Sequence, residues 1–86
     1  MAIVTLRYWA AAKEAAGISE ETIAADTLAD ALSAAGASAG QDSRFRAVLA
    51  RSSFLIDGTP VGIRAPDAVI LDDASVIEVL PPFAGG

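Results

Sequence analysis

Residues 75–86 read SVIEVLPPFAGG, and this stretch decides how the rest of the chain is interpreted. Its first half is an apolar run rich in β-branched residues, which predicts a strand. Proline has no N–H to donate and fixes φ, so we expect sheet pairing to stop near Pro81 while the chain stays extended. Glycine has no side chain, so Gly85 and Gly86 fit a slot too narrow for other residues. The stretch predicts a stiff arm presenting a free α-carboxylate; a frayed end after the last strand is the plain alternative.

The two ends of the chain both read as strands with one strongly apolar face. In residues 75–80 we expect Ile77 and Val79 in the core and Glu78 toward solvent, because side chains alternate between the faces of a strand. Residues 2–8 alternate in a similar way, and their core face consists of Val4, Leu6 and Tyr8. Two strands this apolar are expected to lie side by side and parallel at the centre of a sheet, with the helical region crossing between them.

The region between the end strands mixes helical and strand patterns. Gly17 and Gly36 end two short helices, and either Asp26 or Thr27 caps the second of these. Pro60 marks a weak or edge strand after an Asp-Gly turn. The expected order is a strand at 2–8, a helix at 9–16, a strand at 19–25, a helix from 27 or 28 to 35, a helical stretch capped by Asp42 or Ser43, and short strands or apolar segments at 52–56, 59–63, 68–71 and 75–80. This order predicts an α+β fold with a mixed sheet.

Composition narrows the class of protein. We expect residues 1–86 to form one domain, because 86 residues are enough for a single core, and the 53% of hydrophobic residues indicates a folded chain. The chain has no cysteine and no histidine, which removes the thiolate nucleophile, the usual general base and the common transition-metal ligands. A net charge of −5 argues against nucleic-acid binding, and no apolar run is long enough to span a membrane. We therefore expect a cytoplasmic protein that binds neither nucleic acid nor membrane.

Two clusters of charge are the only other candidates for a site in the body of the chain. Arg44, Arg46 and Arg51 are the one local concentration of positive charge, and they are interpreted either as an anion site or as a solvated helix face. Asp72 and Asp73, with Asp67 nearby, could hold a hard cation, although acids in such a loop more often form a turn. We predict no metal site.

The α-carboxylate of Gly86 is the most distinctive reactive group that remains. A carboxylate is a poor electrophile, but joining it to AMP supplies a good leaving group, after which a sulfur donor could convert it to a thiocarboxylate. The chain has no glycine-rich phosphate loop, so the activating enzyme would be another protein. Six residues from Pro81 reach about 20 Å when extended, enough to enter a partner's active site.

Three segments resemble the molybdopterin-synthase small-subunit (MoaD) family. They are VTLRYWAAAKEAAG at residues 4–17, TLADAL at 27–32, and DDASVIEVLPPFAGG at 72–86. The resemblance implies a β-grasp, ubiquitin-like fold in which 81–86 forms a protruding functional tail. It also implies that the chain is a non-catalytic sulfur donor, with catalysis in the partner. By position, Gly86 is the adenylation and thiocarboxylation site, and the tail and partner interface comprise Pro81, Pro82, Phe83, Ala84 and Gly85.

The same resemblance implies a set of partners. Gly86 would be adenylated by a MoeB-like E1 enzyme that uses ATP, and sulfur would come from a donor such as a desulfurase or a rhodanese-type protein. The tail would then enter a MoaE-like large subunit, in a heterotetramer, and give its sulfur to the molybdopterin dithiolene of the molybdenum cofactor. No cofactor is expected on this chain itself.

Other functions stay open at this point. A CysO-like carrier for cysteine synthesis has a similar length and end, whereas ThiS-like carriers for thiamine synthesis are usually shorter and lack Pro-Pro here. A protein-interaction module with an idle tail is a further alternative. Phe83 stands where the family often has a smaller aliphatic residue, and it is expected either to contact the partner or to cover the edge of its own sheet.

Overall fold

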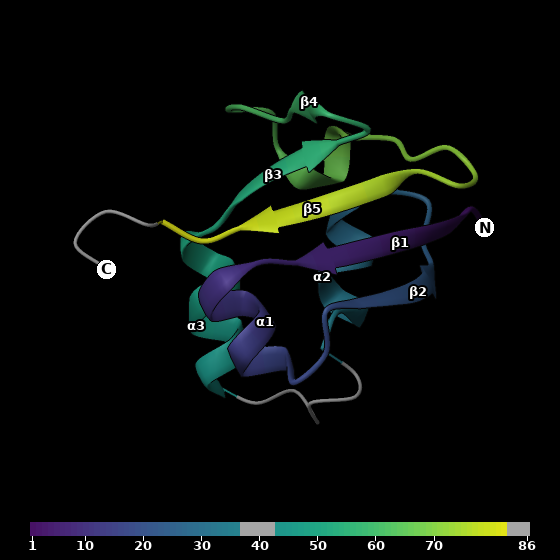
Figure 1. Ribbon diagram of the computed structural model, residues 1–86. Helices are drawn as coiled ribbons and strands as arrows, with labels where there is room; N and C mark the ends of the chain where they lie inside the picture. The colour runs from purple at the N-terminus through teal and green to yellow at the C-terminus, as the bar shows by residue number, and fades with distance from the viewer. Residues whose placement is uncertain (37–42, 83–86) are drawn as a thin grey trace.

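A computed structural model describes residues 1–36 and 43–82 (Figure 1). Strands and helices alternate in the first half, and short strands follow in the second half. The elements are β1 (Ile3–Tyr8), α1 (Ala10–Ala16), β2 (Glu20–Ala24), α2 (Leu28–Ala34), α3 (Ser43–Arg51), β3 (Ser53–Ile56), β4 (Thr59–Pro60), the 3-10 helix η2 (Pro66–Ala68) and β5 (Val76–Leu80). The predicted α+β class is confirmed.

The strands form one mixed sheet in the order β2-β1-β5-β3-β4. β1 and β5 pair in parallel, with Leu6 opposite Ile77, and all the other strand pairs are antiparallel. The first and last strands therefore lie next to each other inside the sheet, as the sequence predicts. Figure 1 shows the helices on one side of this sheet, with α1 and α3 together near the end where β5 finishes.

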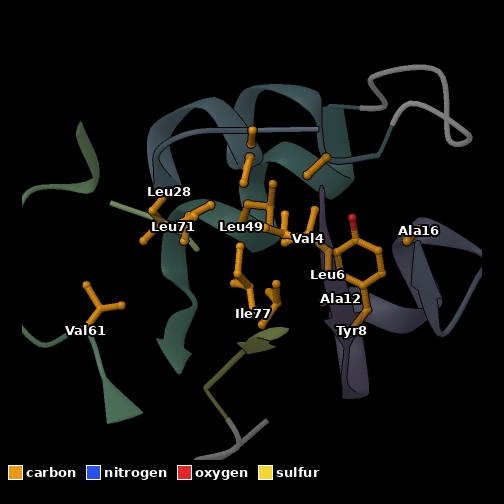
Figure 2. Close-up of a cluster of buried hydrophobic side chains, with 14 of the residues drawn as sticks. Val4, Leu6, Tyr8, Ala12, Ala16, Leu28, Leu49, Val61, Leu71 and Ile77 are labelled. Atoms are coloured by element: carbon orange, nitrogen blue, oxygen red, sulfur yellow. The ribbon is translucent and has the colours of Figure 1, made fainter. Parts of the chain in front are cut away.

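The core lies between the helices and the face of the sheet that they cover. Val4, Leu6 and Tyr8 on β1 are no more than 1% exposed, and Ile77 and Val79 on β5 are fully buried. Figure 2 shows the labelled sheet residues pointing toward the labelled residues of the helices, among them Leu28 and Leu49. The core residues expected on both strands are thus confirmed, and Glu78 alternates with them onto the opposite, partly exposed face.

Two predicted capping residues mark the end of α1 and the start of α2. Gly17 has φ 78° and its N–H bonds back to Lys13, so it ends α1 as a left-handed cap. At α2, Thr27 is the cap, because its hydroxyl accepts a hydrogen bond from Asp30 N at 3.1 Å. The carboxylate of Asp26 instead accepts from Ala2 N at 3.3 Å.

The hairpin that joins β3 and β4 has a two-residue turn. Asp57 and Gly58 have φ values of 50° and 84°, the left-handed geometry that an Asp-Gly pair favours. β4 is only two residues long and lies at the edge of the sheet, which agrees with the weak strand expected around Pro60. The expected apolar segment at 68–71 pairs only through a single bridge between Thr27 and Ile70. Among the described residues, no helix is long and apolar enough to cross a membrane.

Candidate functional site

The base of the C-terminal arm is fixed to the body of the protein. β5 pairs with β1 on one side and β3 on the other, and it ends at Leu80. Pro81 is buried and Pro82 is exposed, so the chain leaves the body between these two residues. Pairing stops where the prolines predict. The predicted tail residues Phe83, Ala84, Gly85 and Gly86 lie outside the described residues.

Trp9 lies beside the base of the arm. Its backbone N–H donates to the carbonyl oxygen of Val79 at 3.3 Å, and it precedes α1 with extended backbone angles. The sequence places Trp9 inside the first helix, but α1 begins one residue later, at Ala10. The helix starts later because Trp9 has an extended backbone and its N–H bonds to the sheet at Val79. Trp9 is 43% exposed, so it offers a large apolar surface close to the exit of the arm.

A groove of about 340 Å³ lies on the helix side of the same exit. Its lining comes from α1, α3 and the base of the arm. The residues are Ala11, Arg44, Ala47, Val48, Arg51, Pro81 and Pro82. The α3 members are spaced i, i+3, i+4 and i+7, so they form one stripe along the helix with an arginine at each end. This spacing is visible in the sequence, but the sequence does not reveal that the stripe meets the two prolines.

The arginine cluster predicted from the sequence divides into two functions. Arg46 turns toward the end of α2 and donates to the carbonyl oxygens of Leu32, Ser33 and Ala35, the last at 2.6 Å. It therefore satisfies carbonyls that lack helical partners, which is a structural function. Arg44 and Arg51 instead line the groove, and Arg44 Nη2 lies 3.9 Å from Glu14 Oε2. Arg46 fits neither an anion site nor a solvated helix face, because it binds backbone carbonyls. Arg44 and Arg51 are exposed, as expected for a solvated helix face.

The face of the sheet opposite the helices is the second surface at the exit. It carries the residues that alternate with the core, and they are partly or fully exposed. Arg7 lies between Glu20 and Glu78 in register, and its Nε is 3.3 Å from Glu20 Oε2. The apolar members nearest the arm are Leu80, the last residue of β5, and Leu55, which lies opposite Glu78. The arm therefore leaves the body between a half-apolar sheet face and a groove lined by arginines.

A partly buried hydrogen-bond network lies at the C-terminal end of α2. The hydroxyl of Tyr8 donates to the Glu21 carboxylate, which also accepts from Gly36 N at 3.0 Å. Burial, together with this bond and the negative charge of Glu21, raises the pKa of Tyr8 well above its ordinary value. The ring of Tyr8 packs edge-to-face on Phe45 with centroids 5.4 Å apart. This network fixes β1, β2 and α3 together but contains no exposed group that could react.

The acidic loop before β5 makes backbone contacts. Asp73 Oδ1 accepts from Ile3 N at 2.8 Å, and Asp72 N donates to Ser75 Oγ at 3.2 Å. Within residues 1–36 and 43–82, no group of three or more metal-ligating side chains gathers, with Asp67 or elsewhere. The turn interpretation of these acids therefore accounts for the contacts observed.

Comparisons with solved structures bear on the fold. The small archaeal modifier protein 1 of Methanosarcina acetivorans aligns with a TM-score of 0.80 at 23% identity, covering 100% of this chain and 98% of that one. SAMP1 of Haloferax volcanii aligns with a TM-score of 0.75 at 23% identity, covering 98% and 99%. A chain from the complex of subunits 1 and 2 of the Helicobacter pylori molybdopterin-converting factor aligns with a TM-score of 0.69 at 20% identity, covering 98% and 99%.

These likenesses, over nearly the whole length of each chain, define the fold as β-grasp and ubiquitin-like. No protein-family model matches the chain, and no curated protein matches it by sequence. The fold implied by the sequence resemblance is confirmed.

Proposed function

We propose that this protein is a sulfur carrier and the small subunit of a molybdopterin synthase. One observation carries the proposal. A ubiquitin-like sheet sends its inner strand β5 directly into a Pro-Pro arm, and four residues beyond Pro82 the sequence reaches Gly86. The pairing of β5 on both sides holds Pro81 in place, so the arm starts from a rigid base. A rigid base with a narrow, side-chain-free tip suits a chain that delivers its own carboxylate into another protein.

In this function the chain supplies the reacting carboxylate and the partners supply the catalysis. The Gly86 carboxylate attacks the α-phosphorus of ATP in an adenylating enzyme, and pyrophosphate leaves. Hydrosulfide supplied by a donor protein then attacks the acyl carbon, AMP leaves with the bonding electron pair, and loss of the S–H proton leaves a thiocarboxylate. The absence of cysteine and histidine from the sequence fits a chain without a nucleophile or base of its own.

The recipient of the sulfur is proposed to be a large subunit that encloses the tail. The Helicobacter pylori neighbour was solved as a complex of subunits 1 and 2 of a molybdopterin-converting factor, and this supports a partner of that kind. The exposed Trp9 and the apolar residues Leu55 and Leu80 are the surfaces beside the arm on which the partner would pack. The heterotetrameric assembly with this large subunit is proposed from the sequence resemblance alone.

A second candidate function is that of a protein modifier. It is favoured by the two SAMP1 neighbours, which are named as small archaeal modifier proteins. The same activated Gly86 would then form an amide with an amine of another protein instead of receiving sulfur. Carriers for cysteine or thiamine synthesis remain alternatives from the sequence.

Sulfur transfer separates these functions. The chain is thiocarboxylated with radioactive sulfur and mixed with the large subunit and its pterin precursor, or in parallel with a cysteine-synthase-type enzyme and its substrate. The proposal expects label in the pterin product only. Label in cysteine would assign the chain to the cysteine pathway. Label that stays on the carrier, together with stable conjugates to other proteins, would favour the modifier function.

A further inference from the structure

The groove beside the arm concentrates positive charge on an acidic domain. The net charge of the chain is −5, yet both ends of the groove carry an arginine, Arg44 and Arg51. Both lie on α3, and Ala47 and Val48 form the apolar stretch between them. A short apolar patch flanked by two cations complements a peptide segment in which a carboxylate stands beside apolar residues.

Three other arginines, Arg7, Arg46 and Arg64, are engaged within the domain. Arg7 pairs with Glu20, Arg46 binds the carbonyls at the end of α2, and Arg64 donates to the carbonyl oxygens of Val61 and Pro60. In the described part of the chain, no hydrogen bond or ion pair is seen for the side chain of Arg51. Its charge faces the groove and adds to that of Arg44, which lies 3.9 Å from Glu14 in an exposed pair. An exposed pair of this length contributes little to stability, and the positive charge of the groove rests mainly on Arg51.

The groove also lies close in sequence to the carboxylate that a partner would bind. Pro82 is one of its lining residues, and only residues 83–86 separate it from the carboxylate that reacts in the proposed function. Four extended residues span at most about 14 Å. A protein that encloses the carboxylate in an active site therefore brings its own surface against α3 and the two prolines.

We propose that this groove is a docking site for an acidic segment of the large subunit that receives the sulfur. A carboxylate side chain of that segment pairs with Arg51, with Arg44 contributing, and its apolar neighbours lie on Ala47 and Val48. The recipient is chosen over the adenylating enzyme because the related solved assembly is a complex of subunits 1 and 2. This inference rests on the proposed function and extends the contact with the same partner from the base of the tail onto α3.

The test compares two charge reversals of equal size. Arg51→Glu places a like charge against the acidic segment, whereas Lys13→Glu makes the same change on an exposed α1 residue outside the groove. Each purified chain is first thiocarboxylated by the adenylating enzyme and checked by mass spectrometry. Its dissociation constant for the large subunit from the same genome is then measured by calorimetry at low and high salt, after thermal melts confirm that both variants fold.

The inference expects both variants to be thiocarboxylated like wild type, with Arg51→Glu binding the large subunit at least about tenfold more weakly at low salt, and Lys13→Glu binding like wild type. High salt should weaken wild type toward the variant, because an exposed charge contact is screened. A charge reversal at one acidic residue of the large subunit should restore binding to Arg51→Glu.

Three results would overturn the inference. Equal binding by wild type and Arg51→Glu would show that the groove is not part of the interface while leaving the carrier function intact. Loss of thiocarboxylation in Arg51→Glu with unchanged recipient binding would assign the groove to the adenylating enzyme. A wild-type chain that binds no large subunit would overturn both this inference and the proposed function.

Discussion

The backbone N–H of Trp9 donates to the carbonyl oxygen of Val79 at 3.3 Å, and this bond ties the end of β1 to the strand that leads into the arm. The bond continues the parallel register in which Tyr8 lies opposite Val79. On the other side of β5, Val79 lies opposite Phe54 of β3. The base of the arm is therefore held by strands on both sides. We expect the stability of the domain not to depend on the residues beyond Pro82.

Gly36 is predicted to be the glycine least tolerant of substitution among those described. Its φ is +77°, and a Cβ there would lie 2.5 Å from Cδ2 of Phe45, whose ring is fully buried. Gly36→Ala combines a left-handed backbone with overpacking, so we expect a loss of about 2–4 kcal/mol in the free energy of unfolding. Urea denaturation measures this loss.

Gly58→Ala is the matched control for Gly36→Ala. Gly58 has a similar φ of +84°, but a Cβ there meets nothing within 4 Å. We expect Gly58→Ala to lower the free energy of unfolding only by the cost of the left-handed backbone, about 1–2 kcal/mol. Equal losses for the two variants would show that contact with Phe45 contributes nothing.

Tyr8 is expected to make stability depend on pH in the alkaline range. Its pKa is raised in the folded protein, so the folded state keeps a proton that the unfolded chain releases above the ordinary value of 10.0. Stability from this group is therefore complete below that pH and falls as the pH rises further. Tyr8 is the only tyrosine, so tyrosinate absorbance reports it alone. We expect no tyrosinate signal in the folded protein at the pH where the urea-unfolded chain is half ionised.

Tyr8→Phe is expected to remove this part of the alkaline dependence. It also loses the hydrogen bond to Glu21, at a cost of about 1–3 kcal/mol near neutral pH. A variant that stays as stable as wild type at neutral pH, and whose alkaline dependence is unchanged, would contradict the network described here.

Arg46 is expected to stabilise the domain, whereas Arg51 is not. Arg46→Met keeps an apolar stem but removes the donors to Leu32, Ser33 and Ala35, so we expect a loss of about 1–3 kcal/mol. Arg51→Met, on the same helix but exposed, should change stability by no more than about 0.5 kcal/mol. Thermal melts of the two variants make the comparison; if Arg51→Met lost as much as Arg46→Met, the division of the cluster would be wrong.

Alternation and capping signals predicted much of the fold from the sequence. The core faces of β1 and β5 follow from the alternation of apolar residues at every second position. Gly17 ends α1 as the predicted C-cap. The parallel pairing of the two end strands also followed, because two strongly apolar strands need the most buried positions in the sheet.

What the sequence left undecided depends on contacts between distant residues. Thr27 and Asp26 are equally good caps by type, and only the position of Ala2 shows that Asp26 bonds elsewhere. Likewise, nothing in the sequence around Arg46 and Arg51 says which one meets the end of α2. The groove escaped prediction for the same reason, since it forms only where α1, α3 and the prolines meet.

The central claim is that the Gly86 carboxylate carries sulfur, and the most direct measurement is the intact mass of the chain after incubation with an adenylating enzyme, ATP and a sulfur donor. Wild type should gain the mass difference between sulfur and oxygen, and fragmentation should place the gain on Gly86. A chain lacking Gly86 should show no gain, while its melting temperature stays near that of wild type. An unchanged wild-type mass with every activating enzyme of this type, or an equal gain without Gly86, would contradict the account.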